Sequence, residues 1–237
     1  MPLRLIPAAV CALGAHAILY GTFRPGGGLH GYFGWYEPAL AVFALAVVLH
    51  GGSWKALHNL THTGHLCISF RESGIATFNV EYRRVGDPGG GWPGSFDDVL
   101  RAVEHARGLA TRLVLVGHSA GGHLALLAAA RLQLPVVAIA AVSDPATWAN
   151  DAVPAFFGGD PPAEASPLAQ APLGVPHILV HGTRDDVVPF EQSARYVEAA
   201  GGEAELVPLE GAGHFEPIDP LSPESAVVRA AVERLLA

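Results

Sequence analysis

The segment Leu113 to Arg131, LVLVGHSAGGHLALLAAAR, constrains the fold more than any other part of the sequence. Four apolar residues, Leu113 to Val116, are typical of a strand buried on both faces, and the leucines and alanines that follow Ala120 form an apolar helical surface. The residues between them, GHSAG, follow the pattern G-x-S-x-G. In that context a sharp strand-to-helix turn exposes a serine hydroxyl beside the free N–H groups of a helix. We therefore expect Ser119 to be a nucleophile held in a strained turn.

A second glycine turn follows the apolar run Val42 to Leu49, with the sequence HGGSW at positions 50–54. Two glycines directly after a buried strand allow backbone N–H groups to approach a ligand closely, which is what an oxyanion hole requires. An ordinary glycine turn is the alternative. Its pairing with GHSAG favours the oxyanion hole.

An acid and a base follow further along the chain, each just past an expected strand. The run His177 to Val180 leads into HGTRDDVVP, which contains Asp185, and the run 203–209 ends before GAGHF, which contains His214. A neutral imidazole can accept a serine proton, and a carboxylate holds the ring in the correct tautomer. Serine, acid and histidine in this order are the chain order of the α/β-hydrolase triad.

Other histidines have weaker claims to the role of base. His118 and His123 lie too close to the serine in sequence to reach its hydroxyl, and His181 is expected to be buried at a strand end, so we assign all three structural roles.

A metal site is a further alternative, because His58, His62 and His65 would share one face if the segment 56–73 were a helix. No carboxylate or cysteine lies at matching spacing, and Gly64 weakens such a helix. We therefore predict no metal ion and no other cofactor.

Two irregular segments are candidates for covering the site. The first, residues 83–95, contains GDPGGGWPG, and its Trp92 is either a lid over a cleft or packed against the sheet edge. The second, residues 145–176, is rich in Pro, Ala and Gly and is predicted to be a small cap, with a loop packed on a helix as the alternative. The side chains expected to line the substrate pocket are Trp54, Trp92, His118, Trp148 and Phe157.

Composition limits the remaining possibilities. A chain of 237 residues, half of them hydrophobic, is predicted to form a single domain over 1–237, as a monomer or homodimer. A net charge of −8 with only 14 Lys and Arg argues against nucleic-acid binding. Cys11 and Cys67 are too isolated for a disulfide framework.

The N-terminal residues 1–38 allow two interpretations. Ala15-His16-Ala17 after an apolar stretch resembles a secretory cleavage site, whereas residues 17–21 could begin an early edge strand, which we favour. The protein is accordingly expected to be cytoplasmic, or secreted if residues 1–17 are a signal peptide. The apolar run 40–49 is too short to cross a bilayer, so no stable membrane insertion is expected.

Several motifs together resemble an α/β-hydrolase of the small esterase and arylformamidase type (kynurenine formamidase-like). The resemblance covers residues 39 to the C-terminus and rests on HGGSW (50–54), EYRRVGDPGGGWPGSFDD (81–98), GHSAGG (117–122), HGTRDDVVP (181–189) and GAGHFEPIDP (211–220). It implies an α/β fold with a mostly parallel central sheet, helices on both faces and a short cap. The family's usual first strands have no clear match in residues 1–38.

The resemblance also implies the roles of individual residues. It assigns the acid to Asp185, with Asp186 as the fallback, beside Ser119 as nucleophile and His214 as base. Its HGG-x-W motif assigns oxyanion donors to the backbone of Gly51, Gly52 and Ser53, beside the N–H of Ala120.

The function implied is that of a serine hydrolase that cleaves small carboxylic esters or N-formyl amides through an acyl-enzyme intermediate. A peptidase of the prolyl oligopeptidase type shares the triad, but the chain has no room for the large domain that such enzymes normally carry. A non-catalytic binding protein with the same fold is the other alternative.

Overall fold

The computed structural model describes residues 18–19 and 42–237. The predictions for residues 1–17, including the signal peptide and Cys11, lie outside the described residues, as do those for residues 20–41.

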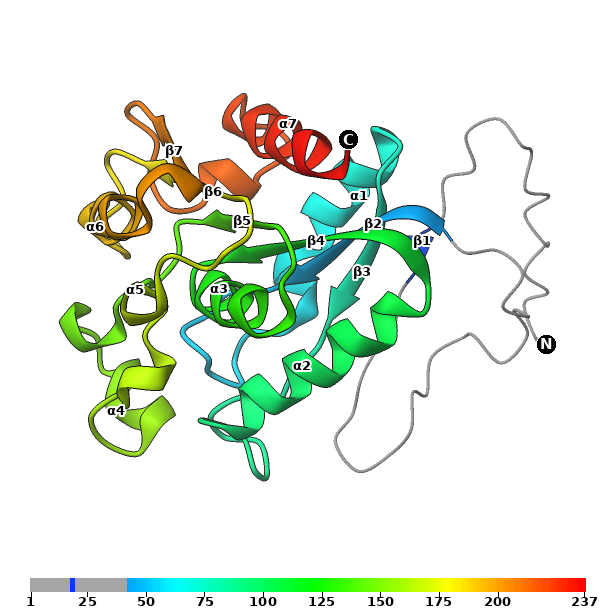
Figure 1. The fold of residues 1–237 in the computed structure, drawn as a ribbon. Helices are drawn as coiled ribbons and strands as arrows, with labels where there is room; N and C mark the ends of the chain where they lie inside the picture. Colours follow the sequence, from blue (N-terminus) through cyan, green and yellow to red (C-terminus); the bar gives the residue numbers. More distant parts are fainter. Residues whose placement is uncertain (1–17, 20–41) are drawn as a thin grey trace.

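A seven-stranded sheet forms the centre of the molecule, with the strand order β1-β3-β2-β4-β5-β6-β7 (Figure 1). Every pairing between these strands is parallel. This confirms the predicted α/β fold with a mostly parallel sheet. The strands are β1 (Ile18–Leu19), β2 (Val42–Leu49), β3 (Ala76–Val80), β4 (Ala110–His118), β5 (Val136–Ile139), β6 (His177–Gly182) and β7 (Ala204–Leu209).

Helices cover both faces of the sheet, because parallel strands need crossover connections. One face packs against α2 (Gly94–Arg107), α3 (Ala120–Leu132) and α6 (Glu191–Ala200). The other packs against α1 (Gly64–Glu72) and α7 (Glu224–Leu236). Short 3-10 helices are η1 (Leu60–Thr63), η2 (Pro145–Thr147), η3 (Ala163–Ala165), η4 (Gly201–Glu203) and η5 (Glu216–Ile218).

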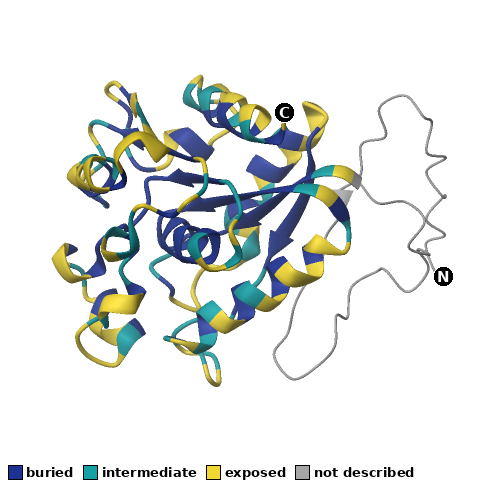
Figure 2. Cartoon of the chain, viewed as in Figure 1, coloured by how far each residue is buried: buried dark blue, intermediate teal, exposed yellow. Residues whose placement is uncertain are grey.

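The central strands are apolar on both sides, as a doubly covered parallel sheet requires. In β2, Leu45, Val47 and Leu49 enter the core on the α2 and α3 side, whereas Ala46 and Val48 enter the core on the α1 and α7 side. Figure 2 shows the result, with a buried sheet and helices whose outer sides are exposed.

The segment 56–73 differs from the sequence prediction in the position where its helix begins. Helix α1 begins only at Gly64, after η1, so the expected helix over 56–73 is wrong for its first half. The cause is the cap at Asn59, whose side chain accepts the N–H of Thr61 and starts a 3-10 turn. His58, His62 and His65 therefore do not share one helical face.

The expected early strand appears as β1, which pairs with β3 at the sheet edge.

Residues 145–176 are more ordered than their composition indicates. Besides η2 and η3, they form α4 (Ala152–Phe157) and α5 (Pro167–Gln170). The N–H of Leu168 donates to the carbonyl of Ser143 at 2.8 Å, and the ring of His123 bonds the carbonyl of Ala165 at 2.8 Å. The segment is thus tied to the end of β5 and to α3.

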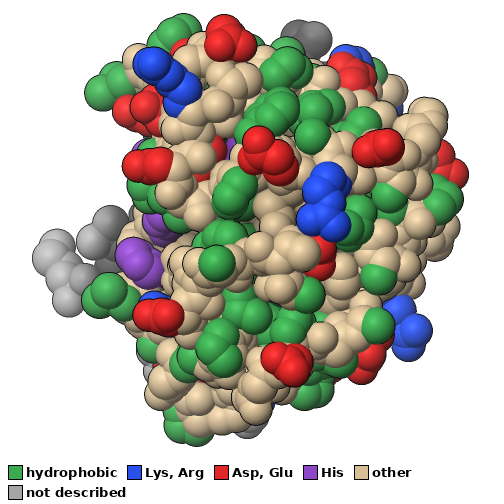
Figure 3. Space-filling model, turned by 90° about the vertical axis from the view of Figure 1, so that its left-hand side faces the viewer, with side chains coloured by type: hydrophobic (Ala, Val, Ile, Leu, Met, Phe, Trp, Pro, Cys, Tyr) green, Lys and Arg blue, Asp and Glu red, His purple; other side chains and the backbone are tan. Residues whose placement is uncertain are grey.

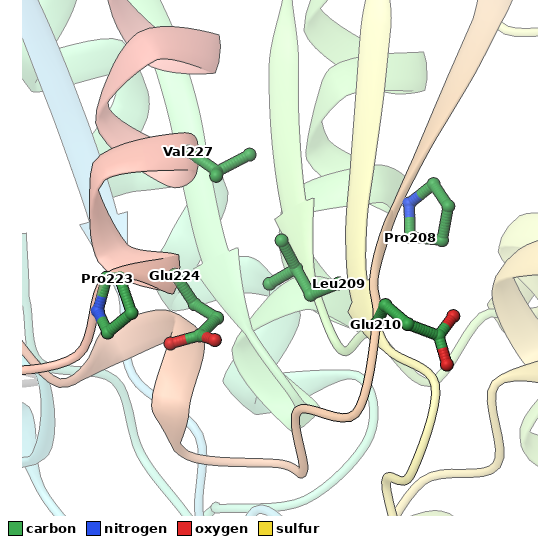
Figure 4. Close-up of a pocket in the computed structure, with 6 residues that line it drawn as sticks. All are labelled: Pro208, Leu209, Glu210, Pro223, Glu224 and Val227. Atoms are coloured by element: carbon green, nitrogen blue, oxygen red, sulfur yellow. The ribbon is translucent and has the colours of Figure 1, made fainter.

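Within residues 18–19 and 42–237, no helix is both long and apolar enough to span a bilayer. On the face drawn in Figure 3, Lys and Arg side chains are scattered singly among acidic and apolar ones, and His side chains reach the surface at one edge. A surface hollow of about 220 Å³ lies between the end of β7 and the start of α7 (Figure 4). None of the residues that line it belongs to the predicted site; they are Pro208, Leu209, Glu210, Pro223, Glu224 and Val227.

Candidate active site

Ser119 lies in a tight turn between the last residue of β4 and the first residue of α3. Its backbone angles, φ 55° and ψ −120°, lie in a region that costs a non-glycine residue free energy. The turn is held because the glycines around it allow backbones to touch. A Cβ added to Gly121 would lie 2.3 Å from the carbonyl oxygen of Leu49, and one added to Gly117 would lie 2.3 Å from that of Gly121. The strand, turn and helix therefore have the form expected of a nucleophile turn.

The HGGSW loop lies directly against this turn. A Cβ added to Gly51 would be 3.0 Å from Cβ of Ser119. Gly52, Ser53 and Trp54 all have positive φ, of 107°, 53° and 56°, so the loop curls back on itself after β2. In the part of the chain from 42 to 237, no main-chain oxygen accepts from the N–H of Gly52 or Ser53. The loop and the start of α3 at Ala120, whose N–H has no partner within its helix, thus bring main-chain donors close to Ser119.

His214 and Asp185 form a buried pair at the same edge of the sheet. His214 Nδ1 lies 2.6 Å from Asp185 Oδ2, and the two side chains are 3% and 0% exposed. The other carboxylate oxygen, Oδ1, accepts the N–H groups of Val187 at 2.9 Å and Val188 at 2.8 Å. The alternative acid, Asp186, is exposed. The structure therefore brings together the histidine and the first aspartate of the predicted triad.

The charge of Asp185 is stabilised although the group is buried. Burial works to raise the pKa of its carboxyl, but the hydrogen bonds from His181 and His214 outweigh this and hold the pKa well below its usual value. His181 Nε2 lies 3.2 Å from Oδ2, and His181 Nδ1 lies 2.7 Å from the hydroxyl of Ser193. An ionised Asp185 keeps the proton of neutral His214 on Nδ1 and leaves Nε2 as the basic nitrogen.

His118 packs against His214 rather than among the other predicted pocket residues. The two rings lie 4.6 Å apart between centroids, and His118 Nε2 is 3.0 Å from the carbonyl oxygen of His214. His118 Nδ1 is 3.1 Å from His62 Nε2. Burial and the neighbouring histidines lower the pKa of His62 to about 4 and hold that of His118 well below its usual value.

Three other predicted pocket residues meet in an aromatic cluster with Phe156, and the cluster is defined as Trp54, Trp148, Phe156 and Phe157. The ring of Trp54 stacks on Phe156 at 4.5 Å and meets Trp148 edge-on at 5.7 Å and Phe157 at 6.0 Å. Trp92 contacts this cluster through Phe157 at 6.0 Å and stacks on Phe96 at 5.3 Å. The main-chain N–H of Trp92 donates to the carbonyl of Phe156 at 2.8 Å, which ties the 83–95 loop to α4. Trp92 is thus packed between α2 and α4.

Sequence reasoning missed two residues beside the predicted base, His62 and Phe215. His62 reaches His118 across a sequence separation of 56 residues, which no local pattern reveals. Phe215 follows His214 directly, is 54% exposed and has its ring 5.0 Å from that of His214. An apolar residue next to a predicted catalytic histidine was the available signal for Phe215.

No group of three or more His, Cys, Asp and Glu side chains in the described ranges, 18–19 and 42–237, is arranged to hold a metal ion.

Comparisons with known proteins bear directly on this site. A family model described as Serine hydrolase matches residues 92–219, which is more than half of the chain and includes Ser119, Asp185 and His214. The chain belongs to the serine hydrolase family. A second family model, BD-FAE, matches residues 37–142 of this serine hydrolase, including the HGGSW loop. Among curated proteins none matches the chain.

Solved structures place the serine hydrolase among α/β-hydrolases by fold. It is similar to a hormone-sensitive lipase from a metagenome library, with a TM-score of 0.69 and 18% identity over 84% of this chain and 79% of that one. It is also similar to a truncated carbohydrate esterase from gut microbiota, with a TM-score of 0.66 and 19% identity over 83% and 87%. An esterase/lipase from an uncultured bacterium has a TM-score of 0.64 and 20% identity over 81% and 75%. At these identities the likeness concerns the fold.

Proposed function

We propose that this serine hydrolase cleaves small carboxylic esters or N-formyl amides through an acyl-enzyme intermediate, with Ser119, His214 and Asp185 as its catalytic residues. The observation that carries the proposal is the buried contact of 2.6 Å between His214 Nδ1 and Asp185 at the sheet edge where the strained turn holds Ser119. Such a carboxylate orients the imidazole and stabilises the imidazolium that forms when the serine loses its proton.

The proposed reaction has two halves. Ser119 Oγ attacks the carbonyl carbon while His214 Nε2 accepts the hydroxyl proton, and the oxygen that becomes negative accepts hydrogen bonds from the loop 51–53 and from the N–H of Ala120. The carbon–oxygen or carbon–nitrogen bond then breaks, and His214 gives its proton to the departing alcohol or amine. Water, deprotonated by His214, attacks the acyl-enzyme and releases the carboxylic acid and the free serine.

The substrate class follows from the surroundings of Ser119. We assign residues 145–176 the role of a small cap within a single domain, because α4 contributes Phe156 and Phe157 to the aromatic cluster beside the HGGSW loop. Rings favour flat groups over long alkyl chains. The proteins of similar fold that carry the names esterase/lipase and carbohydrate esterase support ester cleavage, and the arylformamidase-type motifs support N-formyl arylamines such as formylkynurenine.

Substitution of the nucleophile tests the proposal. Ser119→Ala should abolish hydrolysis of p-nitrophenyl acetate and labelling by a fluorophosphonate, while the unfolding midpoint stays close to that of the unmodified protein. Ser73→Ala changes an exposed serine at the end of α1, outside the candidate site. It serves as the matched control and should retain both activities. Folded Ser119→Ala with full esterase activity would overturn the mechanism. Unmodified folded protein that takes no label would favour the binding-protein alternative.

A substrate panel tests the finer assignment. Aryl esters or an N-formylated arylamine should be turned over with kcat/KM at least about tenfold above medium-chain alkyl esters, a difference of roughly 1.4 kcal/mol in transition-state binding. A preference for octanoyl esters would mean that the rings line an acyl channel, and better turnover of dipeptide amides would favour a peptidase.

A further inference from the structure

The described part of the chain holds a histidine network that the proposed chemistry does not use. His118 is 1% exposed, and both of its ring nitrogens have partners: Nδ1 meets His62 Nε2 at 3.1 Å, and Nε2 meets the His214 carbonyl oxygen at 3.0 Å. A buried imidazole with two fixed partners holds its neighbours in one arrangement.

The partners determine where the protons lie. A carbonyl oxygen only accepts, so His118 Nε2 carries a hydrogen and donates to His214. Burial keeps the pKa of His118 far below neutrality, so the ring has no second proton and Nδ1 is an acceptor. His62 Nε2 must then donate to it. The network therefore has one direction, from His62 to His118 to the main chain of His214.

The same ring touches the other half of the site. A Cβ added to Gly51 would lie 2.9 Å from His118 Nδ1, so this loop packs directly on the imidazole. His118 is thus in contact with the loop expected to bind the oxyanion and with the residue expected to act as base, and it precedes the nucleophile. The groups that face it are His62, His214, Phe215 and, more distantly, the carboxylate of Asp185.

We infer that His118 is a positioning residue that sets the distance between the loop that carries His214 and the loop 51–53. His62 acts through His118 by fixing the orientation of the His118 ring. This inference rests on the proposed function. A neutral ring at this place also suits the reaction, because a charged His118 only 4.6 Å from His214 would oppose formation of the imidazolium.

The test compares variants that keep or remove the hydrogen bonds. His118→Phe keeps a flat ring without either bond, and kcat for p-nitrophenyl acetate should fall about 10- to 100-fold, with KM changed less than about twofold, because small misplacements of catalytic groups are costly. His118→Gln keeps a donor for the His214 carbonyl and should recover most of the loss. His65→Phe, an exposed histidine in the same region, should leave kcat unchanged. All values are referred to the fraction of serine labelled by a fluorophosphonate, which separates misplacement from loss of folded protein.

A double-mutant cycle tests the direction of the network. His62→Phe alone should lower kcat about three- to tenfold, and the double variant with His118→Phe should be no slower than His118→Phe alone, since contacting residues that act in series are not additive. Additive losses, or full kcat per labelled serine in His118→Phe, would overturn the inference. If His118→Phe does not fold, His62→Phe and His118→Gln are used to test the inference. An unchanged kcat in His62→Phe then contradicts the inference. Failure of the proposed function is a different result, in which the unmodified protein neither takes the label nor cleaves esters.

Discussion

The aromatic region, formed by Trp54 and its ring neighbours, is held mainly by ring packing. In the histidine region, by contrast, His62, His118, His214 and Asp185 are joined by hydrogen bonds of 2.6 to 3.1 Å. In the aromatic region two buried polar atoms, Trp54 Nε1 and His123 Nδ1, have no hydrogen-bond partner among the described residues. Packing depends on volume and is not directional, whereas a hydrogen-bonded chain depends on which atom carries each proton. We therefore expect substitutions in the aromatic region to change stability and pocket shape, and those in the histidine region to change turnover.

The largest expected effect lies in the histidine region. Asp185→Asn should lower kcat for p-nitrophenyl acetate about 10³- to 10⁴-fold, because a neutral amide neither holds the required tautomer of His214 nor stabilises its positive charge. Asp186→Asn, at the exposed neighbouring position, is the control and should stay within about twofold of the unmodified protein. More than a tenth of the normal kcat in Asp185→Asn would remove Asp185 from the triad.

The next effect is on stability in the aromatic region. Trp54 is fully buried and contacts four other rings, including that of His123, so Trp54→Ala should lower the free energy of unfolding by about 3 to 5 kcal/mol. Trp54→Phe keeps part of the ring packing and should lose less. Urea denaturation measures both. A loss below about 1 kcal/mol in Trp54→Ala would show that the cluster is loosely packed and would weaken the contrast between the two regions.

The third prediction concerns pH and the contribution of one buried histidine beside Trp54, His123. Burial lowers the pKa of His123 to about 4, while the unfolded chain keeps the ordinary value near 6.5. Between these values the unfolded state binds more protons, so the free energy of unfolding falls as pH drops from about 6.5 to about 4, by an amount on the order of 3 kcal/mol for this residue. His123→Gln, which cannot gain a charge, should flatten the decline. The measurement is denaturation at several pH values for both proteins, and parallel curves would contradict the assignment.

The smallest effect is expected at Phe215, which touches the histidine region but is largely exposed. Phe215→Ala should change the free energy of unfolding by less than about 0.5 kcal/mol, as for other exposed positions. If an aryl group of the substrate packs on this ring, KM for aryl esters should rise about two- to fivefold while KM for ethyl acetate stays constant. Equal changes for both substrates would mean that Phe215 acts through His214 instead.

Much of the fold could be predicted because the decisive patterns are local. The apolar run 42–49 is β2, and the glycines around Ser119 mark a place where two backbones touch. The contact between Asp185 and His214 was also predictable from their positions after β6 and β7, since the carboxyl ends of parallel strands meet at one edge.

Two features could not be predicted from the sequence, one set by a local cap and one by contacts between distant segments. The helix expected over 56–73 was wrong at its start because the cap at Asn59 competes with it, and a capping hydrogen bond of one side chain is a weak signal within a segment that is long enough for a helix. His118 was grouped with the aromatic residues because the sequence does not tell on which side of the turn its ring lies. Its two partners, His62 and the main chain of His214, come from segments 56 and 96 residues away.

The close approach of Gly121 to β2 also bears on how this enzyme can evolve. A single methyl group there would lie 2.3 Å from the oxygen of Leu49 and 2.4 Å from that of His50, so every other amino acid forces the strand and the turn apart. Selection for a new substrate has little freedom at such a position. The segments 83–95 and 145–176 meet each other through side chains and one main-chain hydrogen bond, and descendants of this protein should therefore diversify in these two segments while the turn around Ser119 stays unchanged.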